Sequence, residues 1–555
     1  MKNKLLNNLS VRTADTQPNR ILTVVLAVTI PVLCGIGSVS CKDAQRATET
    51  HSSTDTVISA QSSTENVPAD TDQGNTHTQN LSAATRALFR KLDKQPIEQR
   101  VHIAPLKGGS VVLLIYDALN AQHMSVYGYE RKTTPFMEQI ANQGLILTNH
   151  VSNSTWTRPS FTTIVTGVPK SIHGVEAVGG WRLEPHIHTL AERFRAAGYR
   201  TAGFTGNPLV RKSWGFDQGY QLYEGPTTRG LKAFPNDSIW VNAATKWLDK
   251  IDPEKPFFLM MFLTSSHPPY RPPAQPRTFL SQVPKGEIIE HPFREYKTPL
   301  SADDNLRIQA AYDDEIAYMD AQVNRLFDHL KKIGRMDNTV VAMTADHGEM
   351  MGEHSCYLHA YHMWEQNTRV PFILSAPNLP LKNAMDDRPF THVDIAPTLL
   401  DLVGISFGNE LPGISMVDAL ENPSINQTRM RYTQVNAHGV RRQMMRVGNW
   451  KLIHHNKVED STEEELDRLH PSVHQPNPRD LPSLAWDGER WELFNLNRDP
   501  GETENLYGTT TGETIIKSLK PALDKKRRNA RVAKPDNMKL APELLEALKK
   551  SGYIR

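Results

Sequence analysis

Four residues with carboxylate, imidazole or hydroxyl side chains stand out because of the segments in which they occur. Asp117 comes directly after the apolar run VVLLIY, Asp346 and His347 come after VVAMTA, and Thr157 lies in the segment STWTRPS. Carboxylates, an imidazole and a hydroxyl suit one hard or borderline divalent cation. Such a cation lowers the pKa of a hydroxyl, which is otherwise a poor nucleophile near neutral pH. Together the four residues indicate a metallohydrolase site.

The elements around these residues would bring them to one edge of a sheet. The runs before Asp117 and Asp346 are rich in apolar and β-branched residues, which predicts buried strands whose carboxyl ends hold ligands in open α/β sheets. Thr157 is expected just before a helix, because Pro159 suits a first turn and the apolar run that follows stops at Gly167. The positive end of that helix would face an anionic substrate.

The order of the predicted elements specifies the fold class. Strands are predicted at residues 111–116, 145–151, 200–206, 256–263, 340–345 and 371–376, and helices at 134–144, 188–198 and 312–334. This alternation predicts an α/β fold with a doubly wound, mostly parallel sheet flanked by helices. After Gly404, four short runs, with a hairpin at His438 and Gly439, predict a smaller antiparallel sheet with a covering helix.

In these segments the sequence resembles the sulfatase branch of the alkaline phosphatase superfamily. The resemblance covers most of the chain, and the order and spacing of several stretches carry it, among them VVLLIYDALNAQHMSVYGY, TRPSFTTIVTGVPKSIHG, DNTVVAMTADHGEMMGEH, THVDIAPTLLDLVGI and WELFNLNRDPGETENL. It implies an alkaline phosphatase-like fold, an anionic ester substrate and one divalent metal ion, Ca²⁺, Zn²⁺ or Mn²⁺. The implied metal ligands are Asp117, Thr157, Asp346 and His347.

The departures from the sulfatase pattern bear on the chemistry. Family sulfatases carry a CxPSR motif whose Cys becomes a formylglycine nucleophile, and the matching residues here begin with Thr157 and end with Phe161. The Lys and His of the family's GKWH segment align with Gly206 and Pro208. A Thr nucleophile is instead similar to phosphoryl-transferring relatives such as lipoteichoic acid synthases and lipid A phosphoethanolamine transferases. Those relatives use Glu at the position of Asp117.

Three further residues are candidates for binding or protonating the transferred group. His267 follows the apolar run PFFLMMFL and is expected at a strand end, and His359 matches a His that faces the same pocket in relatives. The guanidinium of Arg158 suits a tetrahedral anion. The alternative for each of the three is a structural or solvent-facing role.

Two hydroxyls compete with Thr157 for the role of nucleophile. They belong to Thr155 and Ser160, and the spacing from Pro159 within the family-like motif is what favours Thr157. Weaker site candidates are Asn153, Asn207 and Lys451.

Composition and the amino terminus bear on partners and location. Lys and Arg (63) nearly balance Asp and Glu (61) among 555 residues, so charge gives no reason to expect a nucleic-acid partner. Cys34 and Cys41 lie in or beside an N-terminal apolar segment, which leaves Cys356 alone in the body and excludes a disulfide framework. The basic amino terminus and the run 21–39 resemble an export signal that ends in a lipobox at Cys41, and the alternative is an uncleaved anchor. Either way we expect an extracytoplasmic enzyme tethered to a membrane of a bacterial cell envelope.

The chain divides into five predicted segments. They are a signal or anchor (1–41), a polar linker with a short helix (42–103), the catalytic α/β domain (104–405), a small C-terminal α+β domain (406–507) and a basic helical tail (508–555). The basic run 517–534 in the tail could contact anionic lipid headgroups or form a solvated helix face.

Three functions from different classes remain open. The favoured one is a metal-dependent hydrolase of phosphoester, phosphonate or sulfuric ester bonds that forms a covalent Thr157 intermediate. The second is a phosphoethanolamine- or glycerophosphate-type transferase acting on envelope lipids or glycans, whose relatives carry several membrane helices where this chain has one candidate at most. The third, a catalytically silent envelope binding protein, does not fit the intact set of four residues. The substrate body, whether small molecule, glycan or lipid headgroup, depends on loops such as 226–236 and 268–297.

Overall fold

A computed structural model gives the fold of the chain. It describes residues 94–97, 99–177, 182–226, 236–274, 276–290, 292, 300–360, 362–422, 429–437, 440–455 and 490–529. The predicted signal with Cys41, the polar linker up to residue 93, the hairpin turn at His438 and Gly439 and the tail beyond residue 529 lie outside the described residues. Within the described ranges, no helix combines the length and the hydropathy needed to cross a bilayer.

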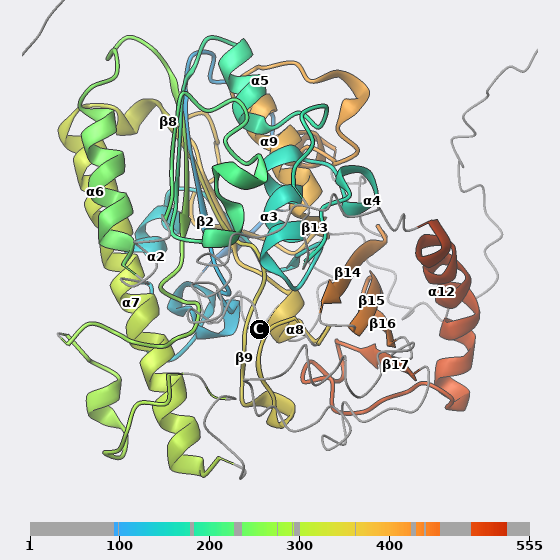
Figure 1. Cartoon of the computed structure of the whole chain (residues 1–555). Coiled ribbons are helices and arrows are strands. Elements are labelled where there is room, and N and C mark those ends of the chain that lie inside the picture. Colours follow the sequence, from blue (N-terminus) through green and yellow to red (C-terminus); the bar gives the residue numbers. More distant parts are fainter. Residues whose placement is uncertain are drawn as a thin grey trace, which may run out of the picture. The chain divides into compact units, whose positions relative to one another are not determined.

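The body of the chain is built on a nine-stranded sheet with the order β1-β12-β3-β11-β8-β2-β7-β5-β6 (Figure 1). All neighbouring strands in it pair in parallel except β11, which is antiparallel to both β3 and β8. The strands are β1 (Gln95–Pro96), β2 (Ser110–Tyr116), β3 (Leu145–Leu147), β5 (Arg200–Thr205), β6 (Leu222–Glu224), β7 (Phe257–Leu263), β8 (Thr339–Ala345), β11 (Phe372–Ser375) and β12 (Ala384–Asp386). The predicted doubly wound, mostly parallel sheet is confirmed.

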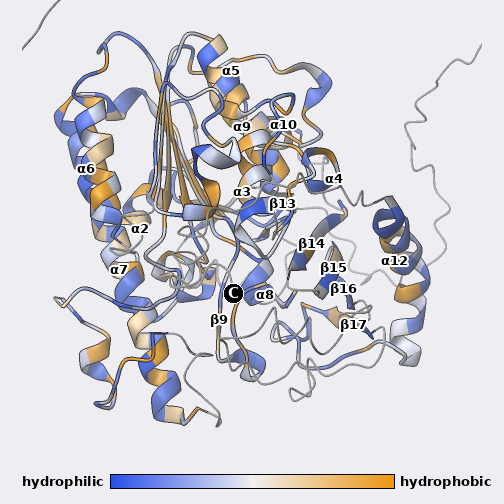
Figure 2. Ribbon diagram, in the orientation of Figure 1, coloured by the Kyte–Doolittle hydropathy of each residue, from blue (hydrophilic) through white to orange (hydrophobic). Residues whose placement is uncertain are grey.

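The central strands β2, β7 and β8 are buried along their whole length because helices cover both faces of the sheet. Successive side chains of a strand point to opposite faces, and the residues of β2 from Val111 to Tyr116 contribute alternately to two separate cores. The strands accordingly form a hydrophobic layer between helices in Figure 2. One face is covered by α2 (Pro135–Asn142), α6 (Asp237–Leu248) and α7 (Ala302–Lys332), and the other by α3 (Thr157–Thr166), α5 (Leu190–Ala196) and α9 (Ile395–Leu402).

Two predicted boundaries differ from the structure. Helix α7 begins at Ala302 rather than at residue 312, because Ser301 and Asp304 form a capping box ahead of a polar first part of the helix. The predicted strand at 145–151 is divided into β3 and a short β4 (His150–Val151), which leaves the main sheet to pair with β13 (Phe390–Thr391).

A four-stranded antiparallel sheet forms the smaller unit, as predicted. Its strands are β14 (Arg431–Ala437), β15 (Val440–Val447), β16 (Trp450–His455) and β17 (Arg490–Asn495). Helix α12 (Thr510–Asn529) covers one face, where Leu519 and Leu523 pack on Leu452. On the other face Met444 and Ile453 pack in one cluster with Trp156 and Trp364 of the body.

A buried group of charges, which we call the joint cluster, links this small sheet to the body. It consists of Glu365, Arg446, Lys451 and Glu502. Lys451 Nζ lies 3.0 Å from Glu365 Oε1 and 2.8 Å from Glu502 Oε1, and Arg446 Nη1 lies 2.7 Å from Glu365 Oε2. Burial would raise the pKa of Glu365, but Arg446 and Lys451 hold it below its ordinary value. Lys451, a weak site candidate in the sequence, is thus a buried anchor between the two sheets.

Candidate active site

The two carboxylates of the site lie side by side at the ends of neighbouring strands. Strands β2 and β8 are parallel, and Tyr116 pairs with Ala345, so the next residues are Asp117 and Asp346. The backbone N–H of Asp346 donates to the carbonyl of Tyr116 at 3.0 Å. Asp346 Oδ1 accepts hydrogen bonds from the N–H groups of Ala118 at 3.1 Å and His347 at 2.7 Å. The turns after β2 and β8 therefore hold one carboxylate oxygen in place and leave the other for a ligand.

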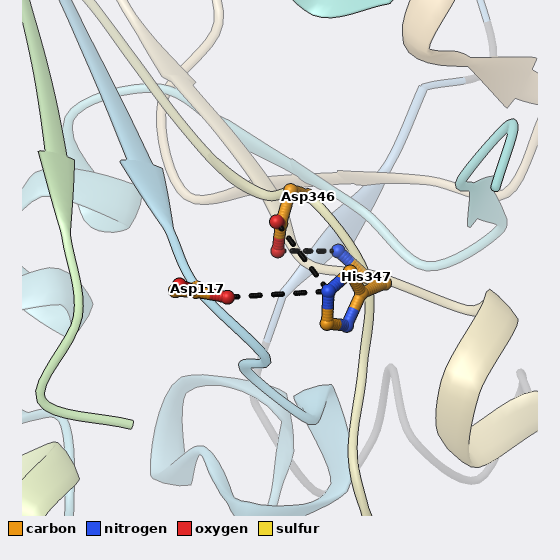
Figure 3. A group of neighbouring side chains, drawn as sticks. All are labelled: Asp117, Asp346 and His347. Carbon is orange, nitrogen blue, oxygen red and sulfur yellow. Dashed lines mark hydrogen bonds and ion pairs between the residues drawn. The ribbon is translucent and has the colours of Figure 1, made fainter. Parts of the chain in front are cut away.

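Asp117, Asp346 and His347 together form a compact group that could hold a cation (Figure 3). Each offers one ligand atom, these atoms lie within 4.8 Å of one another, and all three residues are fully buried. Burial, and next the charge of Asp117, raise the pKa of Asp346 well above its ordinary value. Two buried carboxylates at this separation repel each other unless a positive charge offsets them, so the donor set fits a divalent metal ion.

His347 presents the nitrogen that a metal needs. Its Nδ1 lies 3.0 Å from the carbonyl oxygen of Gly348 and donates to it, which leaves the lone pair on Nε2. Nε2 lies 3.5 Å from Asp346 Oδ2 and 3.9 Å from Asp117 Oδ1. Burial, and next the neighbouring His359, lower the pKa of His347 well below its ordinary value. The imidazole is therefore neutral, the form that ligates metals.

Thr157 is the first residue of α3 and points at this group. Its Oγ1 lies 3.4 Å from His347 Nε2, and the hydroxyl acts against burial by lowering the pKa of Asp346. The helix starts here because Trp156 is extended (φ −143°, ψ 143°) and Pro159 fits the first turn, and it ends at Gly167, which adopts a left-handed conformation with φ 74°. The structure thus brings together all four predicted metal ligands.

The competing hydroxyls lie differently. Ser160 Oγ donates to the backbone carbonyl of Asp346 and lies 3.0 Å from His392 Nδ1. Thr155 is buried, and its Oγ1 has no hydrogen-bond partner among the described residues. Among the described residues, Thr157 is the one of the three hydroxyls that contacts a side chain of the metal-binding group, His347, which supports its choice as nucleophile.

His267 and His359 line the same site. The ring of His359 lies 4.3 Å from that of His347 and 5.1 Å from that of His267, measured between centroids. Beneath them is Glu349, which the sequence analysis did not single out. Its carboxylate oxygens lie 3.2 and 3.3 Å from His359 Nδ1, and one accepts a hydrogen bond from the hydroxyl of Tyr270 at 3.2 Å. Glu349 follows Asp346-His347-Gly348 directly, and that adjacency was the only sign of its role in the sequence.

Arg158, the fourth catalytic candidate, lies against an aromatic side chain. Its guanidinium carbon is 4.4 Å from the centre of the Trp214 ring. Burial lowers the pKa of Arg158 to about 9, and Glu176 acts in the opposite direction. Among the described contacts, none joins Arg158 to the metal-binding group. Asn153, a weaker candidate, faces the small sheet, where its Nδ2 donates to the carbonyl of Tyr432.

The positions at which the sequence departs from the sulfatase motifs are filled without a cation. Phe161 is fully buried and stacks on Phe262 with ring centroids 5.0 Å apart. Asn207, next to Gly206, donates from Nδ2 to Asp117 Oδ2 at 2.6 Å. The two positions where the motif has Arg and Lys are therefore occupied by Phe161 and Gly206, neither of which is charged.

Comparison with known proteins agrees with this geometry. The family model described as Sulfatase matches residues 110–405, and the one described as N-sulphoglucosamine sulphohydrolase, C-terminal, matches residues 352–473. The chain is 22% identical over 525 residues to the N-acetylglucosamine-6-O-sulfatase of Bacteroides thetaiotaomicron, covering 78% of this chain and 88% of that protein. It is 25% identical over 505 residues to the arylsulfatase of Clostridium perfringens, covering 78% and 97%. The structure of the phosphonate monoester hydrolase of Agrobacterium radiobacter is similar with a TM-score of 0.58 and 19% identity, over 76% of this chain and 96% of that one.

The family model, together with the mostly parallel sheet and its strand-end site, places the chain among the hydrolases of the alkaline phosphatase-like superfamily. The family model spans more than half of the chain, including Asp117, Thr157 and the Asp346-His347 pair. The chain belongs to the sulfatase family, and it is a sulfatase-like ester hydrolase.

Proposed function

We propose that this protein is a metal-dependent hydrolase that uses Thr157 to cleave phosphoester, phosphonate or sulfuric ester bonds. The observation that carries the proposal is the position of the Thr157 hydroxyl, buried at the start of α3 with its Oγ1 3.4 Å from His347 Nε2. The start of a helix carries free N–H groups and a partial positive charge, which favour an anionic group beside the hydroxyl. A divalent ion held by Asp117, Asp346 and His347 would lower the pKa of that hydroxyl and offset the charge of the substrate.

The side chains of the site fit a two-step reaction. The Thr157 hydroxyl gives its proton to Nε2 of His359 or His267, whose rings adjoin the group, and its Oγ bonds to phosphorus or sulfur as the bond to the ester oxygen breaks. The same imidazole then passes that proton to the leaving oxygen and returns to its neutral form. His359 Nδ1–H donates a hydrogen bond to the carboxylate of Glu349. This bond fixes the orientation of the imidazole, with Nε2 on the side away from Glu349. Water then cleaves the covalent threonine ester and restores the hydroxyl.

Within this class we propose that phosphorus esters are turned over faster than sulfate esters. Phe161 and Gly206 leave the transferred group without the two cations that the sulfatase motif would supply. A doubly charged phosphate ester depends more on the metal, whereas a singly charged sulfate depends on neighbouring Arg and Lys. The similarity to phosphonate monoester hydrolases supports this choice, and the larger number of relatives named sulfatases supports the alternative, a sulfatase.

A substrate panel tests the proposal. Nitrophenyl sulfate, phosphate, phosphonate and phosphodiester would each be assayed after loading with Ca²⁺, Zn²⁺ or Mn²⁺. We expect phosphate or phosphonate turnover to exceed sulfate turnover with the same metal. A preference for aryl sulfate would refute the choice of ester but not the nucleophile, whereas no turnover of any ester with any metal would refute the function.

A further inference from the structure

A second cavity lies away from the active site, between the body and helix α12. It has a volume of about 590 Å³, which is within the usual range for ligand pockets. Its walls come from α4 (Lys170–His173), the segment around β13, the start of β14, and α12, all of which are labelled in Figure 1. We call it the α12 pocket. None of its lining residues belongs to the group around Thr157.

The charged side chains that line the α12 pocket are all cations. Arg429, Arg431, Lys525 and Lys526 line it, and no Asp or Glu does. Arg429 is paired with Asp394 at 2.6 Å, and the guanidinium of Arg431 is turned to Asn149 at the back. Lys525 and Lys526 are exposed, and neither forms an ion pair within the described part of the chain. The mouth of the cavity therefore carries two lysines that are not neutralised locally.

The structure separates these two lysines from the other cations of α12. Lys520 and Arg527 are each 2.8 Å from Asp524 and lie over the ring of Trp491 on the small sheet. They fasten the helix to the sheet, together with the apolar contacts of Leu519 and Leu523. In the described part of the basic run, Lys520 and Arg527 thus hold the helix on the small sheet, Lys525 and Lys526 line a cavity, and Lys517 and Arg528 are exposed outside it.

The uncharged walls indicate what kind of anion the cavity would accept. Asn153, Ser171, Thr391 and Gln434 supply neutral hydrogen-bonding groups, and the remaining uncharged walls are apolar: Pro169, Val393, Pro412, Met430, Tyr432, Met445 and Ala522. Asn153 Oδ1 is buried and accepts no hydrogen bond from the described residues, so it is available to a hydroxyl donor, while the apolar side chains can pack against the C–H faces of a sugar ring. Among the described residues around the pocket, Ile172 and Met430 are the strongly exposed large apolar side chains, each by 53%. Two isolated apolar groups do not make a membrane-inserting face.

We propose that the α12 pocket is a binding site for a saccharide that carries phosphate or sulfate groups, separate from the site of hydrolysis. Lys525, Lys526 and Arg429 would contact the oxyanions, and the neutral walls would bind the hydroxyls of the sugar. The inference does not rest on which ester Thr157 attacks, because the pocket contains none of the reacting groups.

A pair of charge-reversal variants tests the site in the full-length protein. The first is Lys525→Glu with Lys526→Glu. The matched control is Lys517→Glu with Arg528→Glu, which makes the same change of net charge at exposed positions of the same helix outside the pocket. Binding of a heparin-derived sulfated hexasaccharide and of inorganic phosphate would be measured by calorimetry at low salt. Thermal melting would verify that both variants fold.

We expect the pocket variant to bind the hexasaccharide about tenfold more weakly, the control to change by less than about threefold, and both to keep wild-type turnover of a nitrophenyl ester. Inorganic phosphate should bind more weakly than the hexasaccharide in the wild type, because it cannot use the neutral walls. Equal loss in both variants, or no loss in the pocket variant, would overturn the proposal. It would also be overturned if the pocket variant kept hexasaccharide binding but lost binding to phosphatidylglycerol vesicles, since the lysines would then contact a membrane.

Discussion

Asn207 Nδ2 lies 2.6 Å from Asp117 Oδ2 and donates a hydrogen bond to it, while Asn207 Oδ1 accepts the N–H of Leu209. The amide is therefore held at both ends, and it fixes one oxygen of a carboxylate that would bind the metal. The other oxygen, Oδ1, is the one that approaches His347 Nε2. A residue that the sequence marked only as a weak candidate thus orients a metal ligand.

Replacing Asn207 with Ala should weaken metal binding by roughly 10- to 100-fold, because Asp117 would lose the hydrogen bond that orients it. Metal titration of the purified protein measures this. Asn338→Ala, at a surface position, is the control and should bind metal normally. Unchanged metal affinity in the Asn207→Ala protein would show that Asp117 needs no such support.

Replacing Asp346 with Ala should remove both the metal and the activity while leaving the fold largely intact. The side chain sits at the end of a strand, and its loss removes two hydrogen bonds to the turn but no part of either core. Metal analysis, turnover and circular dichroism would be compared with those of Asp346→Asn, which keeps the shape but not the charge. Full metal content and normal turnover in Asp346→Ala would refute the assignment.

Replacing Thr157 with Ala should abolish the covalent intermediate and lower kcat by on the order of a thousandfold or more, because the reacting oxygen is removed. Thr157→Ser should retain part of the activity. Mass spectrometry of protein quenched during turnover would detect the modified residue in the wild type. Ser160→Ala is the comparison that separates the two hydroxyls, and a near-normal kcat in Thr157→Ala would mean that another group is the nucleophile.

Acid should destabilise the protein in part through His173. Its Nδ1 accepts the N–H of Val175 and its Nε2 contacts Thr163 Oγ1, an arrangement that requires the neutral ring. Burial, and next Lys170, lower the pKa of His173 from 6.5 to about 3. A lowered folded-state pKa means that the unfolded chain binds the proton more tightly, so this contribution to stability is present above pH 6.5 and is lost as the pH falls toward 3.

Between pH 6.5 and pH 5 the wild type should lose about 1.5 kcal/mol more of its free energy of unfolding than a His173→Gln variant. Denaturant titrations at the two pH values measure the difference. His186→Gln, at an exposed position, should behave as the wild type does. Identical pH dependence in His173→Gln and the wild type would contradict the prediction.

We propose that the mature chain begins at a lipid-modified Cys41 and that the enzyme works outside the cytoplasm. The apolar run 21–39 is followed by Ser40 and Cys41, as in a lipobox, although Ser38 stands where Leu is usual. Mass spectrometry of protein extracted from membranes decides between cleavage and an anchor. A peptide that contains Asn19 and Arg20 would show an uncleaved anchor.

The sequence predicted the features that depend on local pattern. The apolar runs before Asp117 and Asp346 predicted strands correctly because both faces of the sheet are covered, and Thr157 was placed correctly by Pro159 and Gly167. Features that depend on contacts between distant segments could not be predicted. Glu349 meets Tyr270 only because the loop after β7 folds back over the strand ends.

The start of helix α7 was also not predicted from the local pattern. Its first turns are polar and lack apolar periodicity, so its start was predicted too late. The position of Arg158 beside Trp214 depends on a contact across 56 residues of chain, which no motif encodes. Site residues at the ends of strands and helices could be predicted from the sequence pattern. Contacts that depend on how the loops fold could not.

The strand order separates the small sheet from the body that carries Thr157, but the joint cluster connects the two. The body and the small sheet should therefore unfold as one cooperative unit. Glu365 belongs to the body, whereas Arg446, Lys451 and Glu502 come from the small sheet and the segment after it. A fragment that ended at residue 405 would keep every reacting group but leave the carboxylate of Glu365 without these partners. It would also uncover Trp156, the residue before Thr157, which packs in a cluster with Ile453. The two sheets share no strand pairing, but each is stabilised by its contacts with the other. A minimal catalytic fragment of this enzyme must therefore include the strands beyond residue 430.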